Sequence, residues 1–104
     1  MPMQEKVFSD DAHERYLLKS YFGAIQPYRD GVVKHGQEYN ESGEKTITFV
    51  EEQAEAAYSN MGTIGADIKP KIIEKLRTEG SGDQWDRDFL QVLSNIIEER
   101  ADST

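Results

Sequence analysis

The stretch from Thr46 to Ile68 constrains the fold most, because its apolar residues repeat at the spacing of a helix that packs against other helices. The gaps between successive apolar positions alternate between three and four residues, which is a heptad spacing. These positions are Ile47, Val50, Ala54, Ala57, Met61, Ile64 and Ile68. Most of their side chains are small or flexible, so the spacing predicts a helix that lies close against its neighbours, within the chain or across a dimer.

Two glycines interrupt the second half of this stretch. Gly62 and Gly65 lie three residues apart, and glycine in a helix interior costs roughly 1 kcal/mol relative to alanine. We therefore expect a turn here, after which Asp67 caps a new helix with Pro70 in its first turn. The alternative is one unbroken helix, in which the two glycines would mark the closest approach of another backbone.

A further helix is predicted upstream. Ser9 is a favourable N-cap, and the apolar residues after it fall at helical spacing as far as about Tyr39. Pro27 lies inside this pattern, so we expect the helix to kink there, or to end just before it and restart. The segment from Asn40 to Lys45 is typical of a loop.

The last helix has the clearest pattern. Asp83 is its expected N-cap and Arg100 closes it. One wide face is apolar and aromatic, formed by Trp85, Phe89, Leu90, Val92, Leu93, Ile96 and Ile97. We expect this helix to lie at the centre of the fold. Residues 46–50 alternate as a strand does, but they lack an obvious second strand to pair with, which favours a helix.

These patterns predict an all-α protein, a compact bundle of four or five short helices. A chain of 104 residues has the size of one domain. We expect a flexible N-terminal segment at residues 1–8, a single helical domain at 9–100 and a flexible C-terminus at 101–104. Because a small core gains from further burial, closure of a homodimer through the Ala-rich heptad positions is an additional hypothesis.

The chain carries 20 acidic and 12 basic residues, a net charge of −8 at pH 7. Nucleic-acid binding needs Lys and Arg to neutralise phosphates, so direct binding of nucleic acid is not expected. The negative field favours a partner protein with a basic surface. There is no cysteine, no apolar run of the roughly 18 residues that span a bilayer and no apolar signal-peptide core. We therefore expect a cytoplasmic protein that does not contact a membrane.

Residues that carry catalysis or bind metals are sparse. The two histidines, His13 and His35, form no His-x-x-x-His or Glu-x-x-His pair. Adjacent carboxylates such as Glu98 and Glu99 diverge by about 100° on a helix, so they do not converge on one substrate. One basic cluster is interpreted as ordinary charges that complement the helix dipole, namely Lys69, Lys71, Lys75 and Arg77. We expect no cofactor, no metal ion and no enzymatic activity.

The predicted function is that of a non-catalytic, acidic helical module that binds a partner protein and inhibits or regulates it. Its contacts are expected to combine a tyrosine, which suits interfaces, with the carboxylates near the C-terminus. These residues are Tyr58, Asp83, Asp86, Asp88, Glu98 and Glu99. Size, acidity and helical character resemble those of immunity proteins, antitoxins and small phage-encoded inhibitors in general character only, and no motif identifies a family.

Two alternative functions rely on other features. A DNA-mimicking inhibitor would need carboxylates spaced like phosphates over one face, and the acidic residues near the C-terminus are the candidates for it. A small-ligand binder or an enzyme would need a pocket with convergent polar groups. The turn from Gly62 to Pro70, or a seam between two chains of a dimer, is where such a pocket is expected.

Overall fold

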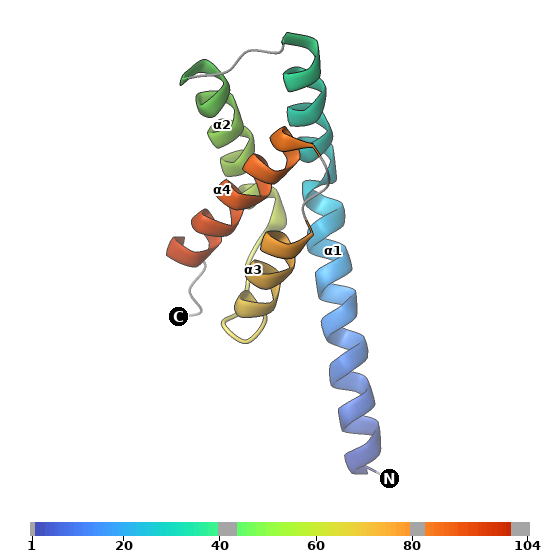
Figure 1. The fold of residues 1–104 in the computed structure, drawn as a ribbon. Coiled ribbons are helices and arrows are strands. Elements are labelled where there is room, and N and C mark those ends of the chain that lie inside the picture. The colour runs from blue at the N-terminus through green and yellow to red at the C-terminus, as the bar shows by residue number, and fades with distance from the viewer. Residues whose placement is uncertain (1, 40–43, 80–82, 101–104) are drawn as a thin grey trace.

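The computed structural model describes residues 2–39, 44–79 and 83–100, and the side chains of residues 12–38, 48–79 and 83–100. These ranges form α1 (Pro2–Tyr39), α2 (Glu44–Met61), α3 (Lys69–Thr78) and α4 (Gln84–Arg100) (Figure 1). They contain no strand, so the all-α prediction is confirmed and the strand alternative at residues 46–50 is wrong. The predicted C-terminal segment, 101–104, and most of the predicted loop at 40–45 lie outside the described residues.

α1 is a single helix of 38 residues, much longer than the short helices expected. It begins at Pro2, so the prediction that Ser9 is its N-cap is wrong, and it continues past Pro27 without a break. Proline in a helix interior costs about 3 kcal/mol. Here Pro27 is exposed while Ile25 and Val32 nearby are buried, and burial of such side chains offsets that cost. The flexibility of residues 1–8 stays a prediction.

The N-terminal part of α1 projects beyond the body that the other helices form (Figure 1). The longest dimension of the molecule is 57 Å, against 28 and 19 Å for the other two, and the radius of gyration is 15.4 Å. A compact chain of this length has a radius of gyration of about 13 Å. The predicted compact bundle is therefore confirmed for the body, to which α1 adds a projecting arm.

The chain turns where the glycines predict it. α2 ends at Met61, and Gly62 follows with a φ of 83°, in the left-handed region that glycine adopts without steric cost. The expectation that Asp67 caps the next helix is wrong, because Ile68 occupies the N-cap and no side chain caps α3 by a hydrogen bond. Pro70 lies in the first turn of α3, as expected.

The heptad positions are buried on both sides of this turn. Those with described side chains are Val50, Ala54, Ala57, Met61, Ile64 and Ile68. The side chain of Ile47 lies outside the described set. The spacing therefore identified residues that face the core of this chain, although α2 and the segment before α3 share them in place of one continuous helix. The homodimer stays a prediction.

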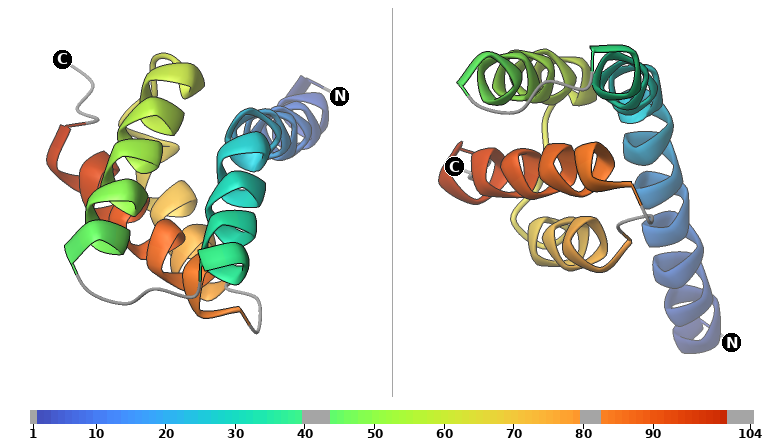
Figure 2. Two further views of the ribbon diagram at one scale, coloured as in Figure 1. Left: turned by 90° about the horizontal axis from the view of Figure 1, so that it is seen from above. Right: turned by 45° about the horizontal axis from the view of Figure 1, so that its top comes forward.

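α4 lies at the centre of the body, as expected, because it packs against α1, α2 and α3 (Figure 2). Its inner face consists of Phe89, Leu90, Leu93 and Ile97, which are all almost completely buried. The helix begins at the predicted cap: the backbone N–H of Trp85 donates a hydrogen bond of 2.8 Å to Oδ1 of Asp83.

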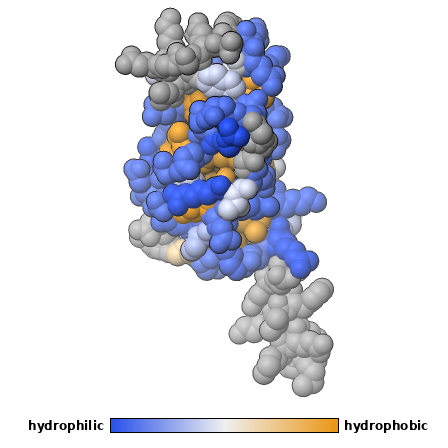
Figure 3. Space-filling view, in the orientation of Figure 1, coloured by the Kyte–Doolittle hydropathy of each residue, from blue (hydrophilic) through white to orange (hydrophobic). Residues whose placement is uncertain are grey.

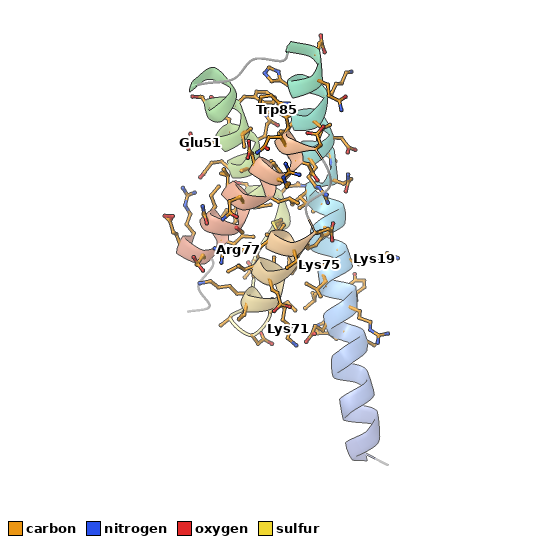
Figure 4. The ribbon with its side chains drawn as sticks, in the orientation of Figure 1. Lys19, Glu51, Lys71, Lys75, Arg77 and Trp85 are labelled. Carbon is orange, nitrogen blue, oxygen red and sulfur yellow. The ribbon has the colours of Figure 1, made fainter. Side chains whose placement is uncertain are left out.

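The start of α4 docks on α1 through a glycine. The indole ring of Trp85 lies so close to Gly36 that a Cβ added to this glycine would fall 2.2 Å from Nε1. Only a residue without a side chain fits there. Trp85 is labelled in Figure 4, in the first turn of α4. One residue earlier in α1, His35 stacks on Phe49 of α2, with ring centroids 4.0 Å apart. These contacts hold the C-terminal part of α1 against both α2 and α4.

Candidate interaction surfaces

Five of the six residues expected to contact a partner lie at the two ends of α4, and the sixth, Tyr58, lies in α2. Asp83, Asp86 and Asp88 belong to its start, whereas Glu98 and Glu99 belong to its last turns. A helix rises 1.5 Å per residue, so Asp88 and Glu98 are about 15 Å apart along its axis. The fold therefore does not bring the six predicted residues together on one surface.

Asp86 is part of the interior rather than of an open surface. Its Oδ1 accepts a hydrogen bond of 2.7 Å from Nε of Arg29, and its Oδ2 accepts one of 2.9 Å from Nη2. The Arg29 side chain is 12% exposed and that of Asp86 is 6% exposed. This two-bond geometry is the strongest form of an Arg–carboxylate pair. Asp86 therefore joins α4 to α1 and exposes little of its side chain, and its contact with a partner protein stays a prediction.

Arg29 also binds α3 near its end. Its Nη1 donates a hydrogen bond of 2.9 Å to Oε1 of Glu79, directly after α3. The pKa of Arg29 is raised, first by the hydrogen bond with Asp86 and then by Glu79, although desolvation acts in the opposite direction. Arg29 thus connects three helices as a permanently charged group. Nothing in the local sequence pattern signals this, because its two partners lie 57 and 50 residues away.

Asp83 and Asp88 are occupied by contacts at the start of α4. Besides capping the helix, Asp83 accepts a hydrogen bond of 3.3 Å from the Gln37 side chain through its Oδ2. Asp88 accepts one of 2.9 Å from the Gln84 side chain, one turn earlier. Both carboxylates remain half-buried. Their contact with a partner protein stays a prediction, and their present role is to organise the first turns of α4.

The other end of α4 is open and negatively charged. Glu98 and Glu99 are exposed, and Arg100 forms an ion pair of 2.6 Å with Glu55 of α2. The hydrogen bond with Glu55 raises the pKa of Arg100, and the nearby Glu99 and Tyr58 raise it further. Tyr58 and Glu99 of the predicted set therefore lie near Arg100 and its partner Glu55, whereas Glu98 pairs with Arg77 of α3. We call these residues, Glu55, Tyr58, Glu98 and Glu99, the acidic end of α4.

A groove runs beside α3 next to the acidic end of α4. Its volume is about 720 Å³. Its lining includes the end of the glycine-containing turn and one face of α3, with charges of both signs: Ala66, Lys69, Pro70, Ile73, Glu74, Arg77, Thr78 and Glu98. Arg77 reaches across to Glu98 at 3.4 Å. This groove, which we call the α3 groove, lies where the sequence suggested a small-ligand site.

A second groove separates α1 from α3. It has a volume of about 530 Å³. Four basic side chains and one acidic side chain line it together with apolar and neutral residues: Arg15, Leu18, Lys19, Phe22, Gly23, Gln26, Arg29, Lys75 and Glu79. We call it the α1–α3 groove. The sequence pattern indicates only a helix-dipole role for Lys75 and does not connect it with α1, because the residues of α1 lie about fifty positions earlier.

Among the described residues, no three His, Asp or Glu side chains lie close enough together to hold a metal ion. Likewise, α1 to α4 as described include no stretch long and apolar enough to cross a membrane. On the face shown in Figure 3, hydrophilic side chains cover most of the surface and apolar atoms show between them. No protein-family model matches the chain, and the searches of curated proteins and of solved structures gave no significant match.

Proposed function

We propose that the protein is a non-catalytic interaction module that binds a partner protein with a basic surface and regulates it through the acidic end of α4. The observation that carries this proposal is that Glu99 and Tyr58 lie near Arg100, which pairs with Glu55, so that α2 and α4 both contribute to this surface. A partner can contact two helices there at once, and the exposed Glu99 needs no rearrangement to reach it.

The chemistry of this surface suits a basic partner. Tyrosine gives a large contact area at a low cost in side-chain entropy and retains a polar tip. The net charge of −8 adds a long-range field that speeds the approach of a positively charged protein. Arg77 and Arg100 already pair with acids of this region, so Glu99 is the carboxylate that we expect to contribute most to the contact.

The test is affinity capture from a lysate of the organism that encodes the chain, followed by titration of the purified partner over a range of salt concentrations. We expect capture of a basic protein whose affinity falls as salt rises and falls about tenfold in the double variant Glu98→Gln/Glu99→Gln. The matched control, Glu51→Gln/Glu52→Gln, removes the same charge from exposed positions of α2. Equal losses in the two variants, or binding that is indifferent to salt, would contradict the proposal.

A second candidate function is supported by the α3 groove, which lies beside the turn from Gly62 to Pro70. A volume of about 720 Å³ is within the usual range for small-molecule sites. A ligand with both polar and apolar parts would contact Lys69 and Arg77 together with Ile73. A fragment screen by NMR tests this: specific shifts at Ala66 and Ile73 would support it, and their absence would remove it. The DNA-mimic alternative has less support, because Asp86 is buried and the other carboxylates lie at two ends of α4.

A further inference from the structure

We propose that the α1–α3 groove is a second docking site, which binds an acidic and partly apolar peptide segment of another protein. This goes beyond the function proposed above, since it concerns a different surface and a partner of opposite charge. Two basic residues of its lining, Lys19 of α1 and Lys75 of α3, are labelled in Figure 4.

Two ion pairs connect the walls of the groove. α1 and α3 are not among the helix pairs that pack extensively. They are joined by an ion pair between Lys71 and Glu14 and by the pair between Arg29 and Glu79. Long charged side chains hold two helices further apart than interdigitated apolar ones do. The space between the helices therefore stays open and keeps an apolar floor of Leu18 and Phe22.

Positive charge is concentrated in this groove although the chain as a whole is acidic. The α3 groove has two basic and two acidic side chains in its lining. A third groove, beside Arg29 and Lys34, has three acidic side chains, Asp30, Asp83 and Asp86, against these two basic ones. The α1–α3 groove instead has four basic side chains and one acidic side chain in its lining. Arg29 pairs with Asp86 and Glu79, and Lys75 pairs with Glu79, so Arg15 and Lys19 account for its excess of positive charge. Charge complementarity therefore selects a negatively charged occupant.

The positions of the basic groups favour a carboxylate-bearing peptide. Arg15 and Lys19 are exposed one helical turn apart on α1, and Lys75 lies on the facing wall, where its Nζ is 5.2 Å from the centre of the Phe22 ring. Acidic side chains one turn apart on a helical peptide match this spacing, and an apolar residue between them would cover Leu18. Such packing of a helix into a groove is a common mode of peptide recognition. A nucleic acid is disfavoured by the overall charge.

Gly23 is a position in the lining where a substitution would fill the groove. It is exposed in the lining, and a Cβ added there would meet no atom within 4 Å. A longer side chain at this position would extend into the open groove, and replacing glycine in a helix stabilises the helix. Gly31 is a matched control, because it lies on the same helix, is also exposed and also has open space around its Cβ, but it does not line this groove.

The experiment selects binders for the full chain from a phage-displayed library of random 16-residue peptides. The selected peptides are then titrated by fluorescence anisotropy. We expect enriched peptides to combine Asp or Glu with Leu or Phe at one-turn spacing. Their affinity should fall at least tenfold in Gly23→Gln and in Lys19→Glu. It should change less than twofold in Gly31→Gln, in Lys34→Glu and in the Glu98→Gln/Glu99→Gln variant.

Several outcomes would overturn this proposal. One is selection of peptides without acidic residues, and another is binding that Gly23→Gln leaves intact. Self-association that Gly23→Gln abolishes would assign the groove to a second copy of this chain. Stronger binding of a single-stranded oligonucleotide than of the selected peptides would assign it to a nucleic acid. Thermal unfolding of each variant shows that a loss of binding does not come from a loss of fold.

Discussion

The two ends of α4 carry similar acidic residues but have opposite environments. At the start, Asp86 is buried in a two-bond pair with Arg29, and Trp85 rests directly on Gly36. At the other end, Glu98 and Glu99 are exposed, and the ion pairs there involve exposed or half-exposed side chains. The comparison shows that a carboxylate at one end stabilises the fold, whereas one at the other is available for binding. The reason is desolvation, because only a buried charge loses water that its partner must replace.

The largest effect is expected from Asp86→Ala. This change leaves the buried guanidinium of Arg29 without its main partner, and the loss of one member of such a pair costs 3–5 kcal/mol, or about 4 kcal/mol here. Urea denaturation measures it as a lower free energy of unfolding. Asp88→Ala is the control, expected to stay within about 0.5 kcal/mol. The double variant Arg29→Met/Asp86→Leu removes both charges and should recover much of the lost free energy of unfolding. If it does not, the two hydrogen bonds between the side chains, rather than an unpaired buried charge, account for the loss.

An intermediate effect is expected from Gly36→Ala. The new Cβ would overlap the indole of Trp85, and overpacking of this kind costs about 1–3 kcal/mol. We expect a lower melting temperature and a shift in the tryptophan emission, which reports on Trp85 because it is the single tryptophan of the chain. Gly31→Ala, where space is open, should instead raise stability by up to about 1 kcal/mol. If Gly36→Ala left the melting temperature unchanged, the start of α4 would be able to move away from the added methyl group at little cost.

The smallest effect is expected at the open end of α4. Glu98→Gln/Glu99→Gln removes two exposed charges, and exposed ion pairs contribute about 0–1 kcal/mol each. Urea denaturation should therefore give a free energy of unfolding within about 0.5 kcal/mol of that of the unmodified chain. A destabilisation close to that of Asp86→Ala would abolish the distinction between the two ends and would make Glu98 and Glu99 structural.

Regular patterns in the sequence predicted much of the fold. The all-α class, the cap at Asp83, the central α4 and the turn at Gly62 each follow from apolar spacing or from the backbone preference of one residue type. The wrong predictions concern helix ends. Ser9 is a residue type that often caps helices, but it lies within α1. Asp67 precedes α3 without capping it. A capping side chain raises the stability of a helix start by only about 1 kcal/mol, so tertiary packing decides where the helix begins.

The candidate surfaces were less predictable than the fold. Asp86 looked like its neighbours Asp83 and Asp88, and the position of Arg29 opposite it depends on how α1 crosses α4. The α1–α3 groove likewise combines residues from the first and third helices, which no short-range pattern connects. The close contact between Gly36 and Trp85 was also hidden, because the two residues lie 49 positions apart on different helices.

What the sequence determined alone is the set of elements and the face of each that turns inward, because helix periodicity, capping and glycine conformation act over a few residues. The tertiary structure alone decided which charges are buried, which remain on the surface and which meet across a groove. Coulomb interaction and desolvation depend on distance and on exposure to solvent, and both are set only when segments about fifty residues apart come together. Asp86 and Glu99, thirteen positions apart on one helix, have different roles for that reason.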